Sequence, residues 1–159
     1  MRRTCHLTLI ILVTLGSCYA QTQDSLAEIS LTSSDAFPVV GSPIFISIKL
    51  TNLSTAPIRI IETNPNKEYR LSVLDESGAQ VPLTPYGKEM GDEQGVIERN
   101  FARTLQPKEA SALRLDLNRF FEFRHPGKYR VFAKRKVYKS NPNSGVDITS
   151  NDLAIDLVN

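Results

Sequence analysis

Past residue 20 the sequence holds one histidine, His125, and this residue type is the best suited to acid–base or metal chemistry. His125 lies directly before Pro126 and Gly127, which indicate a turn, and no Gly-x-Ser-x-Gly sequence supplies a serine nucleophile. Zinc sites need several histidine or cysteine ligands, and the acidic turns lack the spacing of a calcium loop. We therefore predict no catalytic residue, no metal site and no cofactor.

Another group of residues is suited to binding rather than to catalysis. Prolines and glycines interrupt the strand pattern over 84–95, and charged side chains keep this segment in water. The interruption predicts a long surface loop, and long loops often carry binding residues. Since an aromatic ring and a flexible thioether make good contact groups, we predict that Tyr86, Lys88 and Met90 contact a partner. The alternative is a mobile and dispensable loop.

A basic stretch is the third candidate. Residues 124–139 include seven lysines or arginines and no acid. On a strand, residues of one parity share a face, and four of these cations have the same parity: Lys128, Arg130, Lys134 and Lys136. Such a face predicts binding of a polyanion or an anionic membrane surface. The alternatives are a solvated face paired with acidic neighbouring strands, or an edge protected by lysine.

The first 20 residues have the layout of a secretory signal. Arg2 and Arg3 precede the apolar run Leu7–Leu15, which is too short to span a bilayer. The sequence Cys18-Tyr19-Ala20 fits cleavage before Gln21. We therefore predict a signal peptide over 1–20 and a single domain over 21–159, with a strand core over about 26–158.

A second cleavage site is compatible with the same segment. Leu15-Gly16-Ser17-Cys18 resembles a bacterial lipobox, in which Cys18 becomes the acylated first residue of a lipoprotein. The other cysteine is Cys5, so neither cysteine falls in the domain itself, and no disulfide is predicted there. Removing Arg2 and Arg3 takes two charges from the formal net +2 and leaves a neutral domain, which argues against a nucleic-acid partner.

The elements that position these residues are strands. Apolar residues alternate with polar ones, with the period of half-buried strands, at 27–31, 44–50, 69–73, 111–117, 129–133 and 153–157. Short runs at 58–61 and 80–83 add two further candidates, and a helical turn is expected only at 117–124. Turn signals separate the runs at regular spacing. The pattern predicts an all-β domain of eight or nine short strands, folded as a sandwich or a barrel.

Two local motifs carry a family resemblance. Asn52-Leu53-Ser54 is followed by Pro57, and Gly-Lys-Tyr-Arg-Val opens a strand at Gly127. This order, over about 44–133, resembles secreted bacterial immunoglobulin-like domains. It is similar to the accessory β-domain of deuterolysin-like metallopeptidases and to the bacterial proteinase-inhibitor domain. The metallopeptidase sequence His-Glu-x-x-His is absent, so the resemblance implies no catalytic residue. It implies a fold, an all-β, immunoglobulin-like antiparallel β-sandwich of about eight strands.

The resemblance also implies a role for one tyrosine. In such sandwiches a tyrosine at the place of Tyr129 buries its ring and returns its hydroxyl to nearby backbone. Phe120 and Phe123 are spaced to share one side of a helical turn. We predict that this pair closes an end of the sandwich; the alternative is an exposed aromatic platform for carbohydrate.

These observations predict an exported, non-enzymatic binding or accessory module of the bacterial envelope. It would be periplasmic, extracellular or lipid-anchored, and its partner would be a protein or another envelope component. Membrane attachment is expected only through lipidated Cys18. One alternative is a proteinase-inhibitor-like protein that presents a loop to a protease. Another is a small hydrolase without a recognisable motif.

Overall fold

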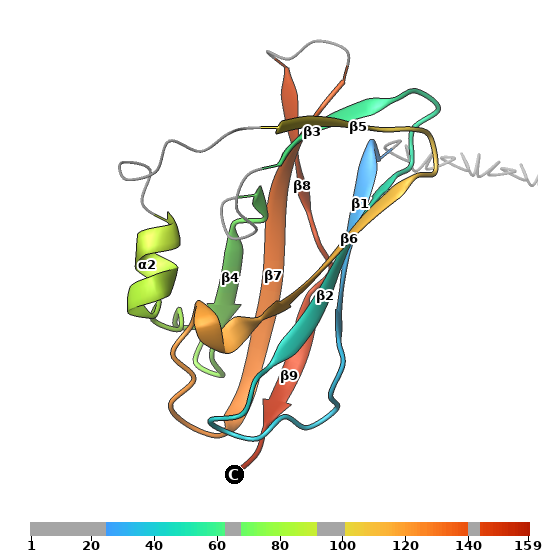
Figure 1. Cartoon of the computed structure of the whole chain (residues 1–159). Helices are drawn as coiled ribbons and strands as arrows, with labels where there is room; N and C mark the ends of the chain where they lie inside the picture. Colours follow the sequence, from blue (N-terminus) through green and yellow to red (C-terminus); the bar gives the residue numbers. More distant parts are fainter. Residues whose placement is uncertain (1–24, 63–67, 92–100, 140–143) are drawn as a thin grey trace, which may run out of the picture.

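The computed structural model describes residues 25–62, 68–91, 101–139 and 144–159. Within these ranges most residues lie in strands (Figure 1). The strands are β1 (Ala27–Ser33), β2 (Phe45–Asn52), β3 (Ile58–Glu62), β4 (Leu71–Leu74), β5 (Phe101–Leu105), β6 (Ala110–Asp116), β7 (Gly127–Tyr138), β8 (Gly145–Thr149) and β9 (Leu153–Leu157). The α-helix is α2 (Pro85–Gly91), and a 3-10 turn, η1, covers Leu117–Arg119.

The strands form two antiparallel sheets. One has the order β1-β2-β6, and the other has the order β4-β7-β3-β5, with β8 and β9 also paired to β7. The 12-residue β7 makes this arrangement possible, because its first half pairs with β4 and β9 and its second half with β8. Figure 1 shows β7 running through the length of the molecule, with α2 outside the sheets.

The apolar residues of the alternating sequence pattern form the core. In β2, Ile46, Ile48 and Leu50 are fully buried, whereas Ser47 and Lys49 between them are exposed. The odd-numbered residues of β7 are buried in the same way. Two antiparallel sheets that bury their facing sides against each other form an immunoglobulin-like β-sandwich, so the predicted fold is confirmed.

Tyr129 occupies the predicted corner position. Its ring is buried and packs edge-on against Phe123, with ring centroids 5.1 Å apart. Its hydroxyl donates a 2.8 Å hydrogen bond to the carbonyl oxygen of His125. Phe120 and Phe123 are both buried, so the prediction that they close the sandwich is confirmed over an exposed platform.

Some predicted elements differ from the structure. Residues 80–83 form only isolated bridges, Leu74 to Gln80 and Leu83 to Phe121, and not a strand. The strands β5 and β8 were not expected. Both are five residues long, and their exposed positions leave too little apolar alternation to be recognised.

The outer edge of β1 is occupied at its middle by a side chain. The backbone N–H of Leu31 donates to Asn151 Oδ1 at 2.7 Å, and Asn151 Nδ2 donates back to the Leu31 carbonyl oxygen at 3.3 Å. Asn151 lies in the connection between β8 and β9 of the larger sheet, and its side-chain amide bonds the edge strand of the smaller sheet. A side-chain amide thus takes the place of a neighbouring strand at this point.

Candidate binding groove

The segment predicted as a loop over 84–95 is in fact partly helical. Residues Pro85–Gly91 form α2, and 92–95 lie outside the described residues. The hydroxyl of Thr84 accepts a 2.9 Å hydrogen bond from the Gly87 N–H, as an N-cap does, and Pro85 stands at the first helical position. Thr84 and Pro85 therefore begin a helix, and the prediction of a loop was wrong for Pro85–Gly91.

A glycine lets α2 approach η1 closely. The Thr84 N–H donates to the Phe120 carbonyl oxygen at 3.0 Å, and the Thr84 hydroxyl donates to the Arg119 carbonyl oxygen at 2.6 Å. A Cβ at Gly87 would lie 2.3 Å from the Phe120 carbonyl oxygen. Only glycine permits this approach, so Gly87 fixes the position of α2.

The three residues predicted to bind have different environments on α2. Tyr86 is 37% exposed, and its ring lies 5.5 Å from that of Phe120. Lys88 is exposed, whereas Met90 is half-buried and packs against the core. The structure therefore places Tyr86 at the surface beside η1, and contact of these three residues with a partner stays a prediction.

Next to Tyr86 lies the outer edge of β6. The Leu117 N–H donates to the Ile44 carbonyl oxygen at 2.9 Å. In this register the backbone N–H and C=O groups of the odd-numbered residues of β6 point toward β2. The N–H and C=O groups of Ala112 and Arg114 consequently point to the other side. No strand among the described residues pairs with β6 there, so this edge of the three-stranded sheet is open.

A groove of about 420 Å³ extends along this open edge between β6, α2 and η1. Leu113 and Leu115 lie in register with the buried Ile48 and Ile46, so they belong to the inner face of the sheet. The residues that line the groove are Phe45, Tyr86, Leu113, Arg114, Leu115, Asp116, Arg119 and Phe120. The groove therefore reaches both faces of β6 and is apolar at its base.

Two arginines give the groove its charge. The Arg114 guanidinium lies 4.1 Å from the centre of the Phe45 ring, and that of Arg119 lies 4.9 Å from the centre of the Tyr86 ring. Neither forms an ion pair with another described residue. Asp116 is engaged elsewhere, because its carboxylate accepts from the N–H groups of Ile44 and Asn118. No described residue therefore neutralises either cation, and each can pair with an acidic group of a partner.

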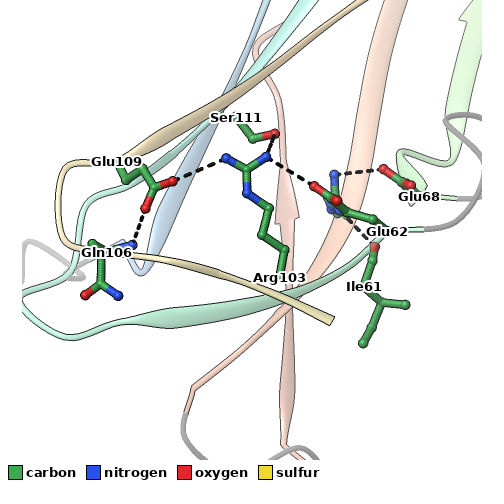
Figure 2. A network of polar contacts seen from close by, with 8 residues as sticks. Ile61, Glu62, Glu68, Arg103, Gln106, Glu109 and Ser111 are labelled. Atoms are coloured by element: carbon green, nitrogen blue, oxygen red, sulfur yellow. Dashed lines mark hydrogen bonds and ion pairs between the residues drawn. The ribbon is translucent and has the colours of Figure 1, made fainter. Parts of the chain in front are cut away.

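An ion-pair network holds the start of β6 in place. Figure 2 shows Arg103 of β5 between two carboxylates, 3.3 Å from Glu62 of β3 and 3.2 Å from Glu109, with Ser111 also in reach. The Gln106 N–H donates to Glu109 at 2.8 Å. This N–H and the Arg103 guanidinium lower the pKa of Glu109 below its usual value. The network joins the two sheets where β5 turns into β6.

One member of the basic stretch is buried. Arg135 lies on the inner side of β7, with its guanidinium 3.2 Å from the Glu68 carboxylate and 4.5 Å from the centre of the Tyr69 ring. It also donates to the Ile61 carbonyl oxygen at 2.8 Å. Arg135 therefore links Ile61 of β3 to Glu68, shortly before β4, and its role is structural.

The four cations predicted to bind a polyanion do share the exposed face of β7. Acidic residues of the neighbouring strands face three of them. Asp152 lies 3.6 Å from Arg130, and Asp156 and Asp147 are in register with Lys128 and Lys136. Such cross-strand pairs reduce the charge of the face. Polyanion binding by Lys128, Arg130, Lys134 and Lys136 stays a prediction.

Within the described ranges, no group of three or more His, Cys, Asp or Glu side chains gathers that could hold a metal ion. No helix in these ranges has the length and apolar character needed to cross a membrane. His125 is exposed, and its backbone carbonyl oxygen accepts the hydrogen bond from the Tyr129 hydroxyl.

Comparison with known proteins gives likeness of fold only. No family model matches the chain, and no curated protein matches it. Among solved structures, it is similar to the CARDB domain of a Pyrococcus furiosus protein in complex with di-metal ions, at 14% identity and TM-score 0.42, covering 83% of this chain and 87% of that one. It is also similar to PapD-like domain 7 of human CEP192, at 13% identity and TM-score 0.42, covering 97% and 98%. A β-glucosidase from Erythrobacter marinus matches at 12% identity and TM-score 0.45, with only 15% of that enzyme covered.

Proposed function

We propose that this chain is an exported, non-enzymatic binding module that recognises a protein partner through the groove between α2 and β6. One observation carries the proposal. A groove with three aromatic side chains, and with two arginines that no described carboxylate pairs with, lies beside an open strand edge. Aromatic residues and arginine are the residue types most enriched at protein interfaces.

The geometry favours binding over catalysis. Among the described residues that line the groove, the only acid, Asp116, already accepts two hydrogen bonds from backbone N–H groups, and there is no histidine, cysteine or serine. A hydrolase needs a nucleophile and a base within hydrogen-bond reach of each other. A concave surface also receives a partner's segment, whereas a proteinase inhibitor presents a protruding loop. The groove therefore supports the binding module over both alternatives.

Site-specific photocrosslinking in the native envelope tests the proposal. A photoreactive amino acid replaces Arg119, which lines the groove, and in a matched variant it replaces Arg59, which is exposed on β3 away from the groove. We expect a crosslinked protein adduct from position 119 that position 59 does not give. The adduct should also disappear when Tyr86→Ala is added. Equal adducts from both positions, or none from position 119, would contradict the proposal.

A further inference from the structure

We infer that the partner contributes an extended segment, with alternating acidic and apolar side chains, that adds to β6 as a further strand. This inference rests on the proposed function, and it specifies the chemistry of the partner and the way it binds. Strand addition uses backbone hydrogen bonds for affinity and alternate side chains for specificity. The open edge of β6 and the residues around it supply both parts.

The backbone of β6 provides a regular row of free groups. The outward N–H and C=O groups belong to the even-numbered residues, of which Ala112 and Arg114 lie at the centre of the strand. None of these outward groups is in a backbone hydrogen bond with a described residue. A row of unpaired backbone groups of this kind is a template for pairing with another chain.

The two faces of β6 favour different side chains on the incoming strand. Side chains on the inner face would meet Leu113 and Leu115, and the rings of Tyr86 and Phe120 add apolar surface to the same groove. Those on the outer face would meet Arg114, which has no ion-pair partner among the described residues. Successive residues of a strand point to opposite faces, so an alternating apolar and acidic segment satisfies both.

The charge also argues against a second copy of the chain in this place. Antiparallel pairing of β6 with another β6 would bring two Arg114 side chains to the same outer face. Like charges at neighbouring cross-strand positions are destabilising. A heterologous acidic segment avoids this repulsion and offers Arg114 a carboxylate, so the charge favours an acidic partner.

A synthetic peptide tests the mode of binding directly. The probe is a seven-residue peptide that alternates valine and glutamate, matching the seven residues of β6, and its controls replace glutamate by lysine or separate the two residue types into blocks. We expect binding of the alternating acidic peptide to be at least about tenfold tighter than that of either control. Hydrogen exchange measured by NMR should show new protection at the amides of Ala112 and Arg114. The amide of Leu113, already directed at β2, should not change.

Two variants separate the backbone from the charge. Ala112→Pro removes an outward N–H and leaves the ladder to β2 intact, because proline is tolerated on edge strands. It should abolish binding while the melting temperature stays close to that of the parent. Arg114→Glu should reverse the preference from the acidic to the lysine peptide, whereas Arg59→Glu, at an exposed position of β3 outside the groove, should leave it unchanged.

The outcomes distinguish this inference from the proposed function. If the photocrosslink at position 119 forms but Ala112→Pro leaves peptide binding and the crosslink unchanged, the groove binds and strand addition is wrong. If the acidic peptide binds no better than its controls, the acidic alternation is wrong. If neither the peptide nor the crosslink depends on groove residues, both proposals are wrong.

Discussion

At the scale of single residues, Tyr129 joins packing and hydrogen bonding at one position. The ring fills the end of the core against Phe123, and the hydroxyl satisfies the carbonyl oxygen of His125. Tyr129→Phe keeps the ring and should lower the free energy of unfolding by about 1 kcal/mol, the usual net value of one hydrogen bond. Tyr129→Ala removes both and should cost about 3 kcal/mol.

Urea denaturation of both variants measures these losses. Tyr138→Phe is the matched control, because Tyr138 is only half-buried and no described group bonds its hydroxyl. A loss below about 1 kcal/mol for Tyr129→Ala would show that the corner does not hold the core.

Tyr69 predicts how stability responds to alkaline pH. Burial raises the pKa of Tyr69 above its ordinary 10.0, and the neighbouring Arg135 opposes that rise. A raised pKa in the folded state means that folding favours the protonated phenol. This contribution is complete below pH 10 and is lost as the pH rises through the raised folded-state pKa. The unfolding free energy should therefore fall above about pH 10, and less steeply in Tyr69→Phe.

Denaturation curves at pH 9 and at about pH 11, on both proteins, check this expectation. The comparison of slopes removes the contribution of lysines, which both proteins share. Identical slopes would mean that Tyr69 is free to ionise in the folded protein.

At the scale of elements, α2 is positioned by a contact that only glycine allows. Gly87→Ala places a Cβ against the Phe120 carbonyl oxygen, so α2 must move away from η1. We expect a loss of about 2 kcal/mol, within the range for overpacking, although alanine is the better helix former. Lys88→Ala on the exposed side of the same helix should change stability by less than about 0.5 kcal/mol.

Thermal unfolding of the two variants checks the prediction. Because Tyr86 moves with α2, Gly87→Ala should also weaken binding in the groove. A neutral or stabilising Gly87→Ala would show that α2 is not held against η1.

The elements differ in how far the sequence could predict them. Long strands such as β2 and β7 have strict alternation, and the buried side chains follow it. The helix α2 is too short for a periodic apolar stripe, so only Thr84 and Pro85 indicated it. The groove depends on which strands lie at sheet edges and on contacts between distant segments. For that reason Phe45, Arg114 and Arg119 were not predicted to bind. Tyr86 was predicted because it lies in a break of the strand pattern.

At the scale of the whole molecule, the proposal of export makes a prediction about covalent structure. The mature protein should begin at Gln21, or at an acylated Cys18 in the lipoprotein form. Intact-mass spectrometry of protein purified from its native envelope distinguishes the two. Retention of residues 1–20 would contradict export, and envelope attachment that survives Cys18→Ala would contradict lipidation.

The hydrogen bonds between Asn151 and Leu31 have a consequence for growth of the β1-β2-β6 sheet. If both of its edges were free, β6 of one molecule could pair with β1 of the next, and repetition of that contact would build an open-ended fibre. Asn151 fills the central N–H and C=O of β1, so a continuous ladder cannot form there. A strand added at β6 therefore ends the sheet, and the same edge that accepts a partner does not start a polymer.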